Sequence, residues 1–303
     1  MTAHQEAIAA NIALLKANHY EQLVSVHTRS FFCAKKTVEL DFSLPIKRKT
    51  LEESAPLVND PNAPKGFNES DMPDAETFAS THPNSIFKPG IKLLDFACGT
   101  GIVTERYLPF IGETGEVVGI DINPDFLARF NERGQAATPK FVGHNYDILD
   151  ESLKKTLDDK FANHFDVITC TLSYHHIDNY RNVTNRLVDF LKPGGWLIII
   201  DFYNEDVERT STVSPNAAIR HMGGLKVDSL VDTLQNFAGL TNATAAREFR
   251  FSTYERREFI ENHSTQETID KLTKGELPQQ EENGVPVYLV EQSIIIALGQ
   301  KKQ

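Results

Sequence analysis

The sequence predicts an α/β protein built around a doubly wound, mostly parallel β-sheet. The first observation behind this prediction begins at Ile91, where short runs rich in Val, Ile, Leu and Phe alternate with stretches of helical periodicity. Such an alternation is typical of parallel strands joined by right-handed helical crossovers. The second observation is a glycine-rich turn, LLDFACGTG (residues 93–101), that lies directly after the first of these runs.

Five strands and four helices are expected in the central part of the chain, from the length and periodicity of each stretch. The strand-like runs are IKLLDFA (91–97), EVVGID (116–121), KFVGH (140–144), FDVITCTL (165–172) and WLIIIDFY (196–203). Helical periodicity occupies residues 101–111, 124–133, 151–159 and 178–191.

In the C-terminal third, the regular alternation of short strands and helices is expected to end. Helices are expected near 226–238 and 256–273, each followed by a strand-like segment, ATAAREFRFSTY and VPVYLVEQSIIIALG. These two segments are expected to pair antiparallel at one edge of the sheet. An exposed apolar final strand would also allow pairing across a homodimer, so a monomer or a homodimer is expected.

The N-terminal part predicts helices followed by an irregular insertion. Residues 3–25 have helical spacing, and a second helical stretch runs through Phe31 and Val38. Prolines recur between Pro45 and Pro89, which predicts an irregular segment with one short helix. We expect residues 1–90 to form a helical cap on a catalytic domain of residues 91–303, with 203–240 as a substrate lid.

Composition excludes several classes of protein. The formal net charge of −11 over 303 residues argues against a nucleic-acid binder, and the one basic run, Lys47 to Lys49, is expected to be a solvated loop. No apolar run approaches the ~18 residues that span a bilayer, and the N-terminus lacks a basic leader, so membrane insertion and export are not expected. Three cysteines without metal-ligand spacing favour a cytoplasmic protein.

Acidic side chains follow three of the predicted strands. Asp95 at the end of the first strand can orient the glycine turn or accept hydrogen bonds from a ligand's amine. Asp121 ends the second strand, where a carboxylate can accept both hydroxyls of a ribose. Asp147 lies just past the third strand, where it can accept from an adenine amino group, and Ile122 and Ile148 can pack against the purine.

The motifs LLDFACGTG, VVGIDIN, FVGHNYDIL, FDVITCTLSYHHI and LKPGGWLIIIDF, in this order, resemble class I S-adenosylmethionine-dependent methyltransferases. The resemblance is greatest to the small-molecule group that includes ubiquinone- and menaquinone-type enzymes, and it covers Ile91 to Asp201. It implies a Rossmann-like seven-stranded sheet with an antiparallel edge strand, S-adenosyl-L-methionine as cofactor and S-adenosyl-L-homocysteine as product. The cofactor-binding residues that it implies are Asp95, Ala97, Cys98, Gly99, Thr100, Gly101, Asp121, Ile122, Asp147, Ile148 and Thr171.

Two positions depart from the family pattern. Ala97 stands where the family has its first loop glycine, and we expect this alanine to keep a negative φ. His144 stands where many relatives have an acid.

The end of the fourth strand, SYHHID, is expected to lie beside the reacting methyl group. His175 and His176 are the candidate catalytic residues, as proton acceptors, although in the family such a pair also packs against or caps the next helix. Tyr20, Tyr174 and His221 are the candidate substrate contacts. Asp201 either touches substrate or caps the segment after it. No metal site is expected, because His175 and His176 are adjacent and no cysteine or carboxylate cluster completes a ligand set.

These observations predict a methyltransferase that acts on a small-molecule acceptor. One alternative is a non-catalytic protein of the same fold that binds adenosylmethionine, with the pocket beside His175 blocked. A dinucleotide-dependent oxidoreductase is the other alternative, but its fingerprint requires a third glycine where this chain has Thr104.

Overall fold

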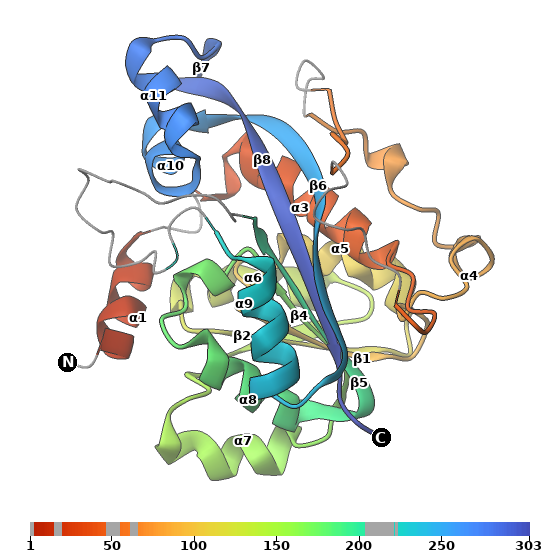
Figure 1. Cartoon of the computed structure of the whole chain (residues 1–303). Helices are drawn as coiled ribbons and strands as arrows, with labels where there is room; N and C mark the ends of the chain where they lie inside the picture. Colours follow the sequence, from red (N-terminus) through yellow and green to blue (C-terminus); the bar gives the residue numbers. More distant parts are fainter. Residues whose placement is uncertain (1–2, 15–19, 47–54, 61–65, 204–220, 222–223) are drawn as a thin grey trace.

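The structure, a computed structural model, describes residues 3–14, 20–46, 55–60, 66–203, 221 and 224–303. Its centre is an eight-stranded sheet in which the strand order is β3-β2-β1-β4-β5-β8-β6, with β7 paired to β8 (Figure 1). The strands are β1 (Lys92–Phe96), β2 (Glu116–Asp121), β3 (Phe141–Asn145), β4 (Phe165–Thr171), β5 (Leu191–Phe202), β6 (Thr241–Arg256), β7 (Gln279–Glu282) and β8 (Val285–Gln300).

Strands β1 to β5 are parallel, and β8 runs antiparallel to both β5 and β6. The predicted doubly wound sheet is therefore confirmed, as is the antiparallel pairing of the last two strand-like segments. The antiparallel strand β8 lies one place inside the edge, because β6 is added beyond it. The idea that the final strand pairs across a dimer is wrong, because both edges of β8 are paired within the chain and its residues Ile294 to Leu298 are fully buried.

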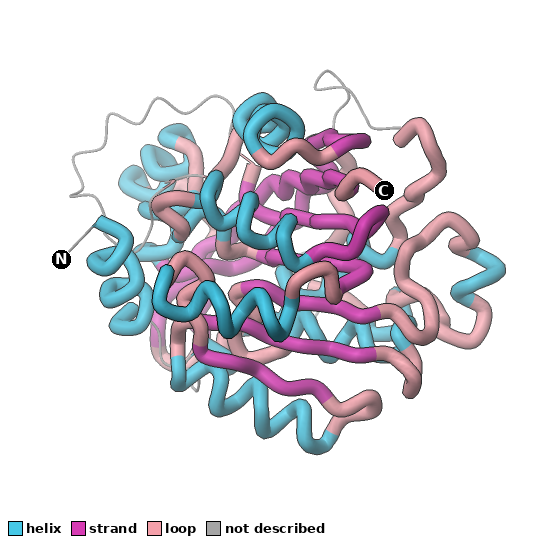
Figure 2. The backbone as a smooth tube through the Cα atoms, turned by 90° about the horizontal axis from the view of Figure 1, so that it is seen from below, coloured by secondary structure: helices cyan, strands magenta, loops and turns pink. Residues whose placement is uncertain are grey.

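Helices cover both faces of the sheet (Figure 2). In the described part of the chain, the α-helices of six or more residues are α1 (Ala3–Leu14), α3 (Val24–Val38), α5 (Ile102–Ile111), α6 (Pro124–Ala136), α7 (Lys154–Phe161), α8 (Tyr180–Phe190), α9 (Val227–Asp232), α10 (Arg257–His263) and α11 (Gln266–Lys274). Single turns are η1 (Glu69–Asp71), α4 (Phe78–Thr81), η2 (Glu151–Leu153) and η3 (Tyr174–His176), and η4 (Thr233–Phe237) is a π-helical turn.

Successive side chains of a strand point to opposite faces, and this alternation builds two cores. Leu93 and Val117 lie in one core with side chains from α3, α5 and α6. Their neighbours Leu94 and Val118 lie in the other core with side chains from α7, α8 and α9. Because α3 fills the first core together with the sheet, this part of residues 1–90 packs as a layer of the main domain.

The predicted lid is corrected in its second half. Helix α9 and the turn η4 bury Leu230 and Leu234 completely against the sheet, so residues 227–237 form part of a packed layer. Residues 204–220 and 222–223 lie outside the described part of the chain, as does the basic run at Lys47. For these segments the lid and the solvated loop stay predictions.

The predicted helix over 256–273 is two helices. The break falls at Ser264, and Thr265 accepts a hydrogen bond from the backbone N–H of Thr268 to cap α11.

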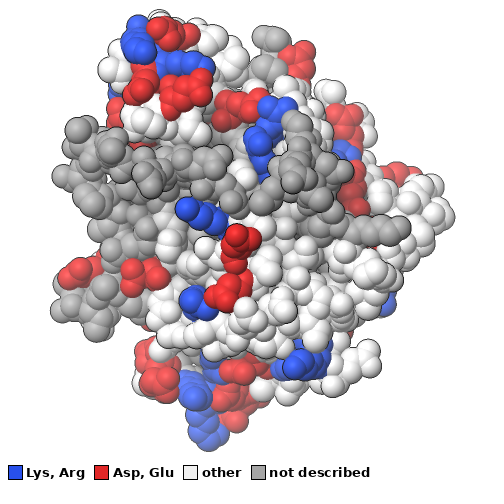
Figure 3. Space-filling model, viewed as in Figure 1, with Lys and Arg blue, Asp and Glu red and all other residues white. Residues whose placement is uncertain are grey.

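Among the described residues, no helix is both long and apolar enough to cross a membrane. At the end of the molecule that carries α10, α11 and β7, basic and acidic side chains lie next to one another (Figure 3).

Candidate active site

The glycine turn between β1 and α5 is tied to the end of β2. The N–H of Gly99 donates to Oδ2 of Asp121 at 2.8 Å, and the N–H of Cys98 donates to the carbonyl of Ile120 at 3.2 Å. Gly101 precedes α5 with φ of +88°, and a Cβ there would lie 3.0 Å from Cδ2 of Phe130. Glycine is required at this position by both the left-handed backbone and the close approach of α6.

Ala97 has φ of +55°, so the expected negative φ is wrong. The chain must leave β1 sharply to reach Gly99, and it does so through a left-handed residue even though a Cβ is present. This conformation costs an alanine about 1–2 kcal/mol. Leu172, at the end of β4, has the same φ of +55°. Both residues line the cavity described below, which agrees with the tendency of backbone strain to occur at functional sites.

Asp95 is a buried carboxylate that accepts hydrogen bonds from two hydroxyl groups. Thr104 donates to Oδ2 at 2.5 Å and Thr169 donates to Oδ1 at 3.4 Å. Burial raises the pKa of Asp95 to about 7, although these two hydrogen bonds act to lower it. Asp95 therefore titrates near neutral pH.

Asp121 organises the ends of β1 and β2. Its Oδ1 accepts from the N–H of Asn123 at 2.8 Å, and its Oδ2 accepts from Gly99. Asn123 in turn caps α6, because its side-chain oxygen accepts from the N–H groups of Asp125 and Phe126. Burial raises the pKa of Asp121, and the backbone N–H groups of Asn123 and Gly99 oppose that rise.

A first cavity of about 210 Å³ opens at the carboxyl ends of β1, β2, β3 and β4. Of the predicted cofactor residues, those lining it are Asp95, Ala97, Cys98, Gly99, Thr100, Asp121, Ile122, Asp147, Ile148 and Thr171. Gly101 is absent from the lining, and its role is to shape the turn. Oγ1 of Thr100 is buried with no hydrogen-bond partner among the described residues, so it is available to a ligand.

The end of β3 contributes Asp147 and Ile148 to this cavity. The N–H of Leu149 donates to Oδ1 of Asp147 at 3.0 Å, which fixes the turn that follows the strand. His144 does not line the cavity, and its Nε2 lies 3.1 Å from Nζ of Lys160.

The turn after β4 is held by Asp201 of β5. Oδ1 of Asp201 lies 2.7 Å from Nδ1 of His175, and Oδ2 accepts from the backbone N–H of His175 at 3.0 Å. Asp201 is fully buried and lines neither cavity, so it orients His175. Nε2 of His175 is buried and has no partner among the described residues.

A second cavity of about 240 Å³ adjoins the first. Tyr20, Leu172 and His176 line both cavities and so form their common wall. His175 lines the second cavity but not the first. A non-catalytic binding protein is expected to have a blocked pocket beside His175. Among the described residues, this pocket is open, because His175 lines the second cavity.

Two predicted substrate contacts lie elsewhere. Tyr174 is fully buried, and its hydroxyl lies 3.2 Å from that of Thr184 on α8, so it packs into the core. The N–H of His221 donates to the carbonyl of His175, and its Nε2 lies 3.2 Å from the carbonyl of Ile177. Neither Tyr174 nor His221 lines the first or the second cavity, and both hold the turn that carries the histidines.

Sequence reasoning missed the residues of the second cavity that come from distant parts of the chain. Arg29 of α3 and Glu255 of β6 form a buried ion pair, and the Arg29 guanidinium lies 4.5 Å from the ring centre of Phe259. His263, at the end of α10, reaches the same cavity, and burial lowers its pKa well below the usual value. No local motif marks these residues, because their partners are distant in the sequence: Arg29 and Glu255 lie 226 residues apart.

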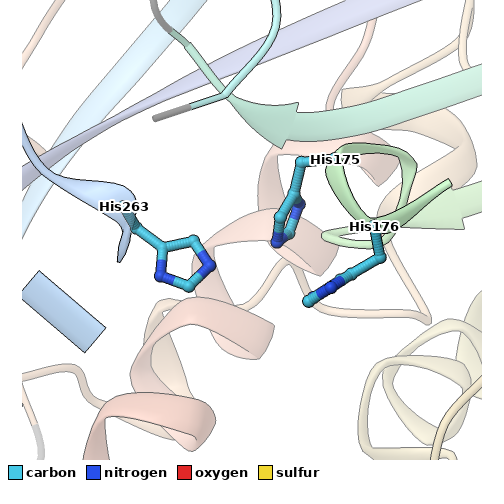
Figure 4. A group of neighbouring side chains, drawn as sticks. All are labelled: His175, His176 and His263. Atoms are coloured by element: carbon cyan, nitrogen blue, oxygen red, sulfur yellow. The ribbon is translucent and has the colours of Figure 1, made fainter. Parts of the chain in front are cut away.

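His263 also removes the reason for expecting no metal site. The sequence offered no third ligand beside His175 and His176, and the fold supplies one: the three rings gather at the second cavity (Figure 4).

Comparison with known proteins identifies the domain that carries the first cavity. Residues 94–197 match the Methyltransf_12 family, described as a methyltransferase domain. An uncharacterized methyltransferase of Schizosaccharomyces pombe is 31% identical over 169 residues, which are 54% of this chain and 58% of that protein. The ubiquinone/menaquinone biosynthesis C-methyltransferase of Ectopseudomonas mendocina is 33% identical over 119 residues, 38% of this chain and 43% of that protein.

A solved structure of a putative methyltransferase from Bacillus halodurans aligns with a TM-score of 0.49 and 19% identity, over 72% of this chain and 95% of that chain. Similarity at this level is too low to assign function. The sequence matches show that residues 94–197 are similar to a methyltransferase domain. The matched regions span 58% and 43% of the two curated relatives.

Proposed function

We propose that this chain is an S-adenosylmethionine-dependent methyltransferase that transfers a methyl group to a small organic acceptor. The observation that carries the proposal is the convergence of Asp95, Asp121 and Asp147, from the ends of three strands, on one cavity that also contains the glycine turn. Bound there, S-adenosylmethionine supplies an electrophilic methyl group on a positively charged sulfur.

The first cavity fits the parts of this cofactor. Asp121 accepts from the ribose hydroxyls, and Asp147 accepts from the adenine amino group. The glycine turn holds the methionine part, where the unpartnered hydroxyl of Thr100 donates to the carboxylate and Asp95 accepts from the ammonium. Ile122 and Ile148 pack against the purine.

The acceptor occupies the second cavity in this proposal. Methyl transfer is an in-line displacement that depends on holding the acceptor atom about 3–3.5 Å from the methyl carbon. The shared wall of Tyr20, Leu172 and His176 is the place where the two cavities meet, so transfer takes place there. His176 faces both partners, while His175 presents Nε2 to the acceptor side; these two remain the candidate catalytic residues.

A small acceptor and a cytoplasmic location are parts of the proposal. A cavity of about 240 Å³ suits a small molecule, and Tyr20 and Arg29, which lie within residues 1–90, cover it. Cys33, Cys98 and Cys170 are buried free thiols, which suit a reducing compartment.

The test is transfer of labelled methyl groups from S-adenosylmethionine to a panel of small hydroxyl, amino and thiol compounds. We expect turnover of at least one class and formation of S-adenosylhomocysteine in equal amount. His176→Ala should lower kcat, whereas His82→Ala, which replaces a histidine stacked on Phe78 of α4, should not. Tight binding of the cofactor without turnover of any acceptor would contradict a catalytic function.

A further inference from the structure

Three histidines from two distant segments converge at the second cavity. His175 and His176 belong to the turn η3 after β4, and His263 is the last residue of α10. One ring nitrogen from each residue lies within 4.8 Å of the other two. Figure 4 shows the three rings directed toward a common space.

The orientation of His175 is fixed by a carboxylate. Its Nδ1 donates to Asp201, because a carboxylate oxygen accepts, and this leaves the lone pair on Nε2. Nε2 is buried, without a partner among the described residues, and lies on a side chain that is 2% exposed. A buried acceptor of this kind points to a missing ligand.

The orientation of His263 is fixed in the same way by a carbonyl group. Its Nδ1 lies 3.0 Å from the carbonyl oxygen of Phe259, which can only accept, so Nδ1 carries the proton and Nε2 has the lone pair. The ring also stacks on Phe259, with centroids 4.3 Å apart. Metal-binding histidines usually donate their second N–H to a carboxylate or a carbonyl, as His175 and His263 both do.

We propose that His175, His176 and His263 bind a divalent transition metal ion of the Zn²⁺ type. Three imidazoles with an open fourth position are a common catalytic zinc arrangement. Metal–nitrogen bonds of about 2.1 Å in a tetrahedron place the nitrogens about 3.4 Å apart, so the rings need to close from their present separation by small side-chain rotations.

The metal site would specify an acceptor that bears a hydroxyl group, and this part rests on the proposed function. All three histidines line the second cavity and His176 is part of the shared wall, so an acceptor oxygen in that cavity would bind the metal and lose its proton to water. An oxygen lone pair then forms the new O–C bond, while the C–S bond breaks with its electron pair remaining on sulfur. The products are a methyl ether and the neutral thioether S-adenosylhomocysteine.

The first test is calorimetric titration of the full chain, freed of metal by a chelator, with Zn²⁺ alone. We expect one Zn²⁺ per chain, and visible absorption bands of a tetrahedral site when Co²⁺ is used as the probe. His263→Ala should weaken Zn²⁺ binding at least about tenfold and abolish the Co²⁺ bands. His263→Gln serves as a second variant, and His82→Ala, at the residue that follows α4, is the matched control, with affinity unchanged.

Titration of the same variants with S-adenosylhomocysteine separates the two proposals. His263 does not line the first cavity, so His263→Ala should bind S-adenosylhomocysteine as the wild type does, which also shows that the variant is folded. The metal site is overturned if the wild type takes up no stoichiometric Zn²⁺, or if neither His263 variant changes its affinity. Zn²⁺ binding without any binding of S-adenosylhomocysteine would instead remove the proposed function and leave the metal site.

Discussion

At the scale of single residues, the protonation of Asp95 makes ligand binding in the first cavity depend on pH. Its pKa is raised to about 7 by burial, so the carboxyl group is protonated below that pH in the free protein. A cofactor ammonium group beside it favours the ionised form, and binding therefore releases a proton.

Because a proton is released, the affinity for S-adenosylhomocysteine should rise with pH up to about 7, by as much as about tenfold per unit, and then level off. Calorimetric titrations between pH 5 and pH 8 measure this, and Asp95→Asn should remove the dependence. If wild-type affinity does not change over this range, Asp95 only orients the turn and does not meet the ammonium.

Ala97 gives a second prediction at this scale, concerning stability. Ala97→Gly should raise the free energy of unfolding by about 1 kcal/mol in urea denaturation, because glycine adopts the left-handed backbone without strain. The control is Ala162→Gly, at a residue with φ of −59°, which should lower it by about 0.5–1 kcal/mol. A loss of stability in both variants would show that Ala97 is not strained.

At the scale of elements, β5 positions the turn that follows β4. Asp201→Asn replaces an oxygen by an NH₂ group facing hydrogen-bond donors, and one buried donor loses its partner. We expect the free energy of unfolding to fall by about 1–3 kcal/mol and Zn²⁺ affinity to fall about 10–100-fold. Urea denaturation and Zn²⁺ titration measure the two effects. Unchanged Zn²⁺ affinity would show that Asp201 does not orient His175 as a ligand.

The elements that local sequence specifies were predicted well, and those that depend on distant contacts were not. Short runs rich in Val, Ile, Leu and Phe predicted β1 to β5, and the glycine residues after the first run predicted the turn. The left-handed φ of Ala97 was missed because alanine ordinarily avoids it, and the break at Ser264 was missed because helical periodicity continues across it. Ten of the eleven predicted cofactor residues line the first cavity, whereas His263 and Arg29 were found only from the fold.

At the scale of the whole molecule, the buried pair of Arg29 and Glu255 fastens the N-terminal helix α3 to β6 over the second cavity. Arg29→Met leaves Glu255 buried without its cation, so we expect the free energy of unfolding to fall by about 3–5 kcal/mol. Replacing Glu255 by Gln as well should recover part of the loss. Chemical denaturation of the single and double variants tests this, and equal stability of Arg29→Met and wild type would show that the pair does not fasten α3.

The same scale explains why the two cavities meet. The acids and the glycine turn lie at the carboxyl ends of the parallel strands, on one rim of the sheet. The adjoining cavity is lined by α3 from the N-terminal part of the chain and by β6 and α10 from the C-terminal third. Cofactor and acceptor would thus be held by different parts of the fold and touch only across Tyr20, Leu172 and His176.

Calorimetric titration of the chain with S-adenosylhomocysteine tests the central claim, that the rim of β1, β2 and β3 holds this nucleoside. We predict one molecule bound per chain, at least a tenfold loss of affinity in Asp121→Ala, and no change in Asp159→Ala, which removes an exposed carboxylate paired with Lys155. Absence of binding to the wild type, together with tight binding of a nicotinamide dinucleotide, would contradict the account.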